Sequence, residues 1–372
     1  MLNTYASYQL ITRDIDKSLN RVQKQPLVDR ETKYYLENIT KVKSIDEFVK
    51  NDRLFKYAMK AFGLEDMAYA KAFMVKALKE GVSDPNSFAN KLTDKRYAEF
   101  VKAFNFAAYG EQATVYNMAQ QLATQNYATQ VKIDGIDPNS DAVKAETNYY
   151  LANIVKVTSI DGLLSNDRLY QYAMKAFGLS TSDFSKEDMR KMLEGGVRDT
   201  KSLANKSDNT RLKAFVTAYN FEALGESATT YNAAQQPATA KYFRQTLEED
   251  AGKDNEGVRL ALYFQRKAPT ITSFYQILGD TALSQVVRTM LGLPDSFAQT
   301  DIDKQAQYLE KRLKISDFSD PKALDKLLTR FTTMWEMDNP STTEQTSLSV
   351  LFQPVEYGVS TNLMLAIQKM KR

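Results

Sequence analysis

The 372-residue sequence contains neither cysteine nor histidine. These residue types supply the thiolate nucleophile, the imidazole general base and most zinc, copper and haem ligands. Their absence excludes disulfides and both of those forms of catalysis. What remains is carboxylate, lysine or tyrosine chemistry and the binding of hard cations by oxygen ligands. We therefore predict a protein that has no cofactor and no metal site and is not an enzyme.

The sequence also lacks long apolar runs. A membrane-spanning helix needs roughly 18 consecutive apolar residues, whereas charges or amides interrupt every apolar stretch here. The first fourteen residues have neither the basic start nor the continuous apolar core of a secretory signal. We expect no membrane insertion and no cleaved export signal.

Neither sign of charge predominates. Lysine and arginine total 49 against 46 aspartates and glutamates, so the net charge is only +3. Basic residues alternate with acidic ones, as in residues 94–96, which is typical of solvated helix faces. A nucleic-acid-binding protein would show a basic patch or stripe. Nucleic acid is therefore not expected as a partner.

Motifs for phosphate and calcium binding are missing as well. The sequence contains neither the P-loop pattern nor the dinucleotide-binding glycine pattern. Residues 134–141 crowd oxygen ligands into a turn, but Asn139 stands where an EF-hand needs glycine and Ala145 where it needs glutamate. We interpret this loop as a polar linker between two parts of the chain.

The chain does contain an internal repeat. Residues 32–64 recur without a gap as residues 147–179, and the correspondence continues to residues 119–121 and 234–236. A divergent third copy follows, in which most identities are lost and the register is shifted by one residue. The predicted organisation is an N-terminal helical or flexible segment (1–30), helical module 1 (31–130), helical module 2 (146–246), divergent helical module 3 (257–338) and a C-terminal tail with a terminal helix (339–372).

Each module reads as several short helices with start and stop signals. Ser44 to Glu47 has the spacing of a capping box. Asp52 precedes an apolar stripe as a cap would, and the pairs Asp84-Pro85 and Asp320-Pro321 suit helix starts. Strand signals are nearly absent, apart from residues 347–352, which suit a short strand or an extended tail. The predicted fold class is all-α, a tandem array of three related multi-helix modules.

Two repeated or paired polar features are candidates for function. The tripeptide Asn-Asp-Arg occurs at residues 51–53 and 166–168, and it suits either a binding site or a helix cap with an attached ion pair; we favour the cap. The carboxylate pairs Glu65-Asp66 and Glu187-Asp188 could in principle serve glycoside hydrolysis. Both lie at expected helix starts, where negative charge stabilises the helix dipole, so we disfavour that use.

Most aromatic residues fall at helical spacing beside aliphatic ones and are expected in the core. Five tyrosines are predicted to leave their rings partly exposed and to form a partner surface: Tyr34, Tyr35, Tyr109, Tyr149 and Tyr150.

The two ends of the chain lie outside the repeat. Residues 360–372 read as a capped helix with a basic end. Six residues of the first segment have helical spacing and form a candidate export or recognition segment: Tyr5, Tyr8, Leu10, Ile11, Ile15 and Leu19. Either end could dock onto the modules or bind another protein. We favour docking, because amphipathic helices usually bury their apolar stripe locally.

Residues 53–74 and 81–100, together with the start at residues 4–14, resemble the alphaproteobacterial domain of unknown function 1217. Genes of that family often lie among flagellar genes. The resemblance implies that the protein belongs to the flagellar system. It identifies no catalytic residues. Proteins exported through the flagellar apparatus commonly lack cysteine and keep an uncleaved N-terminus rich in small polar residues, as this chain does.

The predicted function is therefore that of a non-enzymatic structural or interaction protein of the bacterial flagellar system. Its partners would be flagellar protein components, and it would reach the flagellum or the cell exterior by flagellar export. The alternative is a cytoplasmic helical scaffold or regulator of flagellar assembly. A carboxylate-based cell-wall hydrolase is disfavoured.

Overall fold

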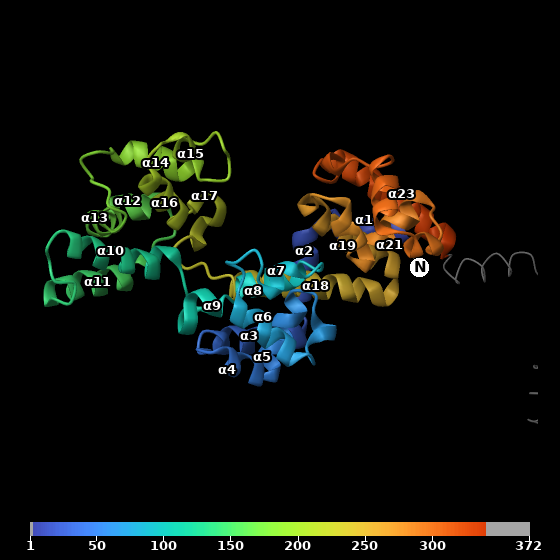
Figure 1. Cartoon of the computed structure of the whole chain (residues 1–372), viewed down its shortest axis with the longest axis horizontal. Coiled ribbons are helices and arrows are strands. Elements are labelled where there is room, and N and C mark those ends of the chain that lie inside the picture. Colours follow the sequence, from blue (N-terminus) through green and yellow to red (C-terminus); the bar gives the residue numbers. More distant parts are fainter. Residues whose placement is uncertain (1–2, 340–372) are drawn as a thin grey trace, which may run out of the picture. The chain divides into compact units, whose positions relative to one another are not determined.

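The structure is a computed structural model that describes residues 3–339. Every regular element in that range is a helix (Figure 1), so the predicted all-α fold class is confirmed. The expected strand or tail at 347–352 and the expected helix at 360–372 lie outside the described residues. The chain divides into two compact units. Residues 19–246 form the paired unit, which contains modules 1 and 2, and residues 3–18 with 247–339 form the described part of the terminal unit.

Modules 1 and 2 are built from the same succession of short helices. In module 1 these are α3 (Pro26–Ile39), α4 (Ile45–Lys50), α5 (Asp52–Ala61), η1 (Glu65–Met67), α6 (Lys71–Glu80), α7 (Phe88–Lys91), α8 (Arg96–Ala103), α9 (Phe106–Tyr109), η2 (Gly110–Gln112), the π-helical turn η3 (Met118–Leu122) and α10 (Ala123–Ile133). In module 2 they are α11 (Asp141–Ile154), α12 (Ile160–Ser165), α13 (Asp167–Ala176), α14 (Lys186–Gly195), α15 (Leu203–Lys206), α16 (Thr210–Ala218), α17 (Phe221–Leu224), η4 (Gly225–Ser227) and α18 (Gln236–Asp254).

Local sequence explains where several of these helices begin. The Ser44 hydroxyl accepts a hydrogen bond from the Glu47 amide at 3.1 Å, as the capping box predicts. The predicted cap of α5 at Asp52 is wrong by one residue, because the Asn51 side chain accepts from the Leu54 amide at 3.2 Å. The predicted start at Asp84 is also wrong. The Asp84 carboxylate instead accepts from the Asn86 amide in a turn, and the next helix begins at Phe88.

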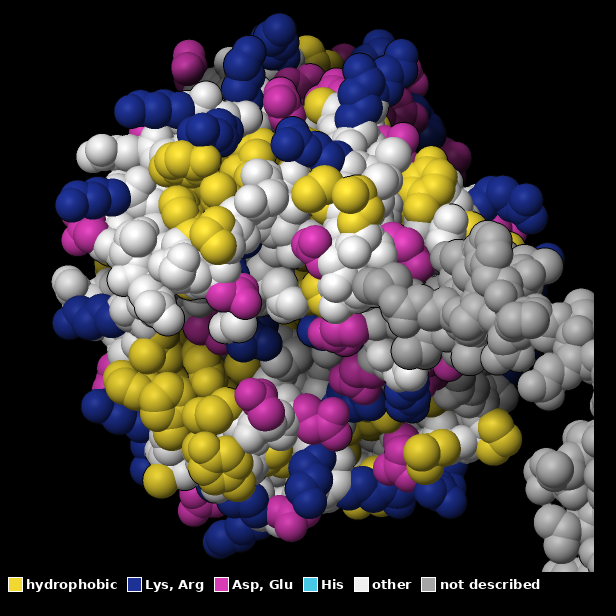
Figure 2. Space-filling model, turned by 90° about the vertical axis from the view of Figure 1, so that its right-hand side faces the viewer, with side chains coloured by type: hydrophobic (Ala, Val, Ile, Leu, Met, Phe, Trp, Pro, Cys, Tyr) yellow, Lys and Arg dark blue, Asp and Glu magenta, His cyan; other side chains and the backbone are white. Residues whose placement is uncertain are grey.

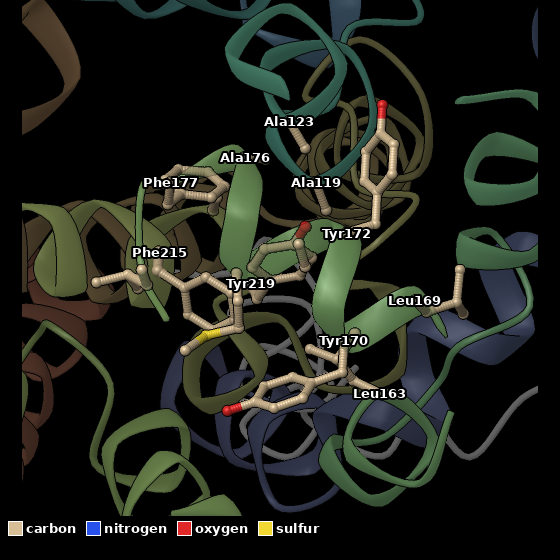
Figure 3. Packing of buried hydrophobic residues seen from close by; sticks show 14 of the residues in the cluster. Ala119, Ala123, Leu163, Leu169, Tyr170, Tyr172, Ala176, Phe177, Phe215 and Tyr219 are labelled. Atoms are coloured by element: carbon tan, nitrogen blue, oxygen red, sulfur yellow. The ribbon is translucent and has the colours of Figure 1, made fainter. Parts of the chain in front are cut away.

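The core of module 2 contains side chains from the segment that precedes it. Ala119, Ala123 and Tyr127 are buried in one cluster with Tyr172 and Tyr219 of module 2 (Figure 3). The Tyr127 and Tyr172 rings stack with centroids 3.8 Å apart. We call residues 119–127 a lead-in segment, because they stand before the module whose core they complete.

The core of module 1 is completed by residues from the far end of module 2. Tyr242 stacks on Tyr57 with ring centroids 3.9 Å apart, and the Tyr35 hydroxyl donates to the Ala234 carbonyl at 2.7 Å. Residues 234–242 match residues 119–127 in the repeat, so they form a second lead-in segment. This segment precedes module 3 in the sequence but packs into module 1.

Reciprocal hydrogen bonds join modules 1 and 2. The Asn117 side chain donates to the Tyr231 carbonyl at 2.9 Å, and the Asn232 side chain donates to the Tyr116 carbonyl at 2.9 Å. Because each bond is matched by its equivalent in the other direction, the two modules are related by an approximate twofold axis, as in a symmetric dimer interface.

The terminal unit contains module 3 and the start of the chain. Its helices are α1 (Thr4–Thr12), α19 (Glu256–Lys267), η5 (Ala268–Thr270), α20 (Phe274–Leu278), α21 (Thr281–Leu291), η6 (Asp295–Gln299), α22 (Ile302–Glu310), η7 (Ile315–Phe318) and α23 (Pro321–Asp338), while α2 (Ile15–Gln23) crosses the boundary between the two units, as α18 does. The predicted start of α23 is confirmed, because the Asp320 side chain accepts from the Ala323 amide at 2.7 Å.

Helix α1 packs against α19 and α23 and completes the core of module 3. Tyr8 is buried in that core and Ile11 packs against it. Residues 4–12 stand as far before Tyr35 as residues 119–127 stand before Tyr150. Residues 4–12 are therefore the third lead-in segment. They complete the core of module 3, although they precede module 1 in the sequence.

Candidate interaction surfaces

Two of the five predicted surface tyrosines form the same arrangement twice. The guanidinium carbon of Arg53 lies 3.7 Å from the centroid of the Tyr34 ring, and that of Arg168 lies 3.7 Å from the centroid of the Tyr149 ring. A cation held over an aromatic face at this distance is attracted by the electrons of the ring. The repeat therefore reproduces a side-chain geometry on the surface as well as a backbone.

Each arginine is also held by a carboxylate of its own module. Arg53 donates to Glu31 at 2.6 and 3.1 Å, and Arg168 donates to Glu146 at 3.0 and 2.9 Å. The Arg53 guanidinium lowers the pKa of the Glu31 carboxyl below its usual range. Two-point pairing fixes the plane of a guanidinium. We call the sets Glu31–Tyr34–Arg53 and Glu146–Tyr149–Arg168 the twin arginine surfaces.

The rest of the repeated Asn-Asp-Arg tripeptide also makes contacts within its own module. Asn51 and Asn166 cap their helices, as described for Asn51 above. The Asp52 carboxylate accepts from Lys71, and Asp167 accepts from Lys186 at 2.6 Å. The structure therefore agrees with a helix cap with attached ion pairs, and the cap is the asparagine.

Tyr35 and Tyr150 do not belong to a surface, contrary to our prediction. Both rings are fully buried. The Tyr150 hydroxyl donates to the Ala119 carbonyl at 2.5 Å and is hydrogen-bonded to the Tyr219 hydroxyl. Burial raises the pKa of Tyr150 well above its ordinary value. These tyrosines hold lead-in segments in place.

Tyr109 is the remaining predicted surface tyrosine. Its side chain is 39% exposed, and its ring stacks on Tyr116 with centroids 3.8 Å apart. It lines a cavity between modules 1 and 2, which the sequence did not reveal.

Some residues of the candidate export or recognition segment are buried and others are exposed. Tyr8 is 2% exposed, whereas Leu10 is 57% exposed on the same helix, and Tyr5 is also exposed. Ile15 and Leu19 on α2 are half-buried. Residues 4–12 therefore dock within the terminal unit, as we favoured, and leave part of one face in solvent.

A polar contact at the start of α1 strengthens this docking. The Thr4 amide donates to the Glu336 carboxylate at 2.9 Å, and the Thr4 hydroxyl donates to the same oxygen. The Asn255 side chain donates to the Thr4 hydroxyl at 2.9 Å. Thr4 itself is fully buried. Sequence reasoning did not find this contact, because its members lie at opposite ends of the described chain.

The carboxylates considered for hydrolysis lie at helix starts, in η1 and in the first turn of α14. Glu187 pairs with Arg190 and Lys191 at 3.7 and 3.5 Å. Within residues 3–339 there is no group of three or more acidic side chains arranged to hold a metal ion.

The described surface mixes charges of both signs. Figure 2 shows one face on which apolar patches are separated by Lys and Arg side chains interspersed with Asp and Glu. No helix within the described part of the chain is both long and apolar enough to cross a membrane.

Comparison with known sequences identifies the family of the chain. The profile of the family described as "Protein of unknown function (DUF1217)" matches residues 61–188 and again residues 176–324. The chain belongs to this family. The two matches agree with the internal repeat, and each runs across a boundary between modules.

A solved structure of similar sequence also exists. An X-ray structure of a protein from Agrobacterium tumefaciens, determined by a structural genomics consortium, is 38% identical to this DUF1217 chain. The match covers 91% of this chain and 94% of that one, with a TM-score of 0.54. No protein with curated annotation matches the chain.

Proposed function

We propose that this DUF1217 protein is a non-enzymatic structural or interaction protein of the bacterial flagellar system. The observation that carries the proposal is the pair of twin arginine surfaces. Each presents an arginine whose side chain is 40% exposed for Arg53 and 47% exposed for Arg168, while two-point pairing fixes the plane of its guanidinium. Arginine and tyrosine in a fixed arrangement are the residues most enriched at binding hot spots.

Because the surface occurs twice, the protein could bind a partner at two points. Two matching surfaces on the paired unit can contact two neighbouring copies of a repeating partner, and linked contacts strengthen each other through a high effective concentration. A polymeric structure such as a flagellum offers such neighbouring copies. The flagellar assignment itself is supported by the family resemblance, the absence of cysteine and the polar N-terminal sequence.

Export by the flagellar apparatus is the route that we propose for the protein, with the bacterial flagellum or the cell exterior as its destination. The N-terminal segment would act before folding, because in the folded chain Thr4 and Tyr8 are buried. That same docking favours the alternative, a cytoplasmic scaffold or regulator, in which residues 4–12 serve only to complete module 3.

Fractionation distinguishes the two proposals. The protein is assayed in cells, filaments and culture supernatant of a wild-type strain and of a strain that lacks the flagellar export gate. We expect an extracellular or filament-bound pool that disappears in the gate mutant. A chain lacking residues 4–14 should lose that pool, whereas Lys144→Gln, which alters an exposed side chain outside the segment, should keep it. A pool confined to the cytoplasm of both strains would reject export and favour the scaffold.

The twin arginine surfaces are tested separately. Arg53→Ala and Arg168→Ala should each weaken association with flagellar structures, and the double variant should weaken it by much more than either single variant if both surfaces bind together. Lys144→Gln, an exposed change in the same unit, is the control. Unchanged association of the double variant would remove these surfaces from the proposal.

A further inference from the structure

Modules 1 and 2 form the walls of a half-open cavity of about 480 Å³ close to their approximate twofold axis. Its size lies within the range of ligand-binding sites. Asn117 and Asn232, which make the reciprocal bonds between the modules, both line it. The cavity is therefore formed only when the two modules pair.

The two halves of the cavity are not chemically equal. Lys102, Tyr109 and Met118 of module 1 stand at the positions that Thr217, Leu224 and Ala233 occupy in module 2. The module 1 half thus carries a cation and two rings, whereas the module 2 half is uncharged and contributes one ring, that of Tyr231. A cavity with two different halves selects one orientation of an asymmetric ligand.

A buried acceptor in this cavity lacks a partner. Asn117 is 5% exposed, and its side-chain oxygen has no hydrogen-bond partner among the described residues. The matching oxygen of Asn232 accepts from the Ala234 amide at 2.9 Å. The difference coincides with the π-helical turn that follows Asn117; at the matching place in module 2, α18 begins at Gln236 with Pro237 as its second residue. The Asn117 oxygen has no accessible surface, so it marks a local difference between the two modules and does not contact a ligand.

The charge of the cavity indicates the chemistry of its ligand. Among the residues that the structure describes, Lys102 is the only charged one in the lining, so no carboxylate of that range faces it there. The Lys102 side chain is exposed and forms no ion pair with any described residue. An anionic group on the ligand would complement it. The stacked rings of Tyr109 and Tyr116 offer an apolar wall for an aromatic or aliphatic group.

We propose that this cavity binds a short peptide segment of a protein partner that carries a carboxylate side chain next to an aromatic or aliphatic one. The carboxylate of the segment pairs with Lys102, and its apolar side chain packs on Tyr109. A peptide supplies both groups on two adjacent residues. The proposal rests on the proposed function in one respect, namely that the partner is a protein.

The test uses the full chain and follows the methyl group of Met118 by NMR, with its signal assigned from a Met118→Leu variant. The probe is the tetrapeptide Ala-Phe-Asp-Ala with both ends capped, and its control is Ala-Phe-Asn-Ala. We expect a saturable shift of the Met118 methyl with the aspartate peptide and at least tenfold weaker binding of the asparagine peptide. Lys102→Gln should weaken the aspartate peptide to a similar extent, whereas Lys144→Gln should leave it unchanged.

A second variant tests the aromatic wall. Tyr109→Leu makes the module 1 half resemble the module 2 half and should lower the affinity severalfold without altering the signals of buried methyl groups. Absence of any Met118 shift at millimolar peptide would overturn the inference. An equal shift by phenylacetate alone would also overturn it in favour of a small-molecule site. Neither result bears on the fractionation experiment, so failure here is distinguishable from failure of the proposed function.

Discussion

The paired unit and the terminal unit complete their cores with lead-in segments from different places. Module 2 uses the segment that directly precedes it. Module 1 uses residues 234–242, which precede module 3, and module 3 uses residues 4–12, which precede module 1. Two of the three modules have therefore exchanged their lead-in segments.

This difference shows that a module cannot complete its core with its own residues alone. Each core needs a lead-in segment, and that segment can come from another part of the chain. Exchange of equivalent elements is a familiar route to dimers between chains. Here the exchange lies within one chain and ties its first residues to its third module.

The largest expected effect comes from removing the lead-in side chain of the terminal unit. Tyr8→Ala should destabilise that unit by about 3 to 5 kcal/mol, as other truncations of buried aromatic rings do, because Tyr8 lies in the core of module 3. Denaturant unfolding should show the loss in the transition of the terminal unit only. Leu10→Ala on the exposed face of α1 should change stability by less than about 0.5 kcal/mol. Equal losses for both variants would contradict the docking of α1.

A smaller effect separates modules 1 and 2. Tyr150→Phe removes the bonds to Ala119 and Tyr219 and should cost about 1 to 3 kcal/mol, whereas Tyr35→Phe removes the bond to Ala234. We expect the Tyr150 variant to be the less stable of the two in denaturant unfolding of the paired unit. The reverse order would show that the hydrogen bonds to the two lead-in segments are not comparable.

Alkaline pH should weaken the paired unit. Burial raises the pKa of Tyr35 and Tyr150, and it raises the pKa of Tyr172 to about 12. Tyrosines of the unfolded chain ionise at about pH 10. Their contribution to stability is therefore fully present below about pH 10 and is lost as the pH rises further. Unfolding free energies measured against pH should fall in this range, and the fall should be shallower in Tyr172→Phe. A flat profile would contradict the burial of these rings.

The smallest expected effect concerns the twin arginine surfaces. Arg53→Lys and Arg168→Lys break a two-point contact with Glu31 and Glu146, and each should lower the melting temperature slightly at low salt and less at high salt. The two losses should agree, since the geometries match. Thermal melts at low and high salt would check this, and a clear difference between the two variants would show that the surfaces are not equivalent.

Much of the helical organisation could be predicted, because modules 1 and 2 share many identical residues at a constant spacing. The gapless match of residues 32–64 with 147–179 identified modules 1 and 2, and the Asp320-Pro321 pair located the start of α23. The exposure of Tyr35 was predicted wrongly, although Thr32, Tyr35 and Ile39 share one helix face and all are buried. Helical spacing could have separated it from Tyr34.

The exchange could not be predicted, because local sequence does not say which of three similar segments fills which module. Docking of residues 4–12 depends on Glu336, and docking of residues 234–242 depends on Tyr57, both far away in sequence. The repetition of Asn117 as Asn232, whose side chains bond reciprocally between the modules, is a signal that could have indicated a paired interface.

Chemical cross-linking tests the exchange most directly, because the chain contains no cysteine and any pair can be introduced cleanly. The Lys241 ammonium of the second lead-in segment lies 3.6 Å from the Glu99 carboxylate of module 1. We predict that a short bis-maleimide joins Glu99→Cys to Lys241→Cys within one chain. Absence of this cross-link in the folded double variant would show that residues 234–242 do not pack into module 1, and it would contradict the account.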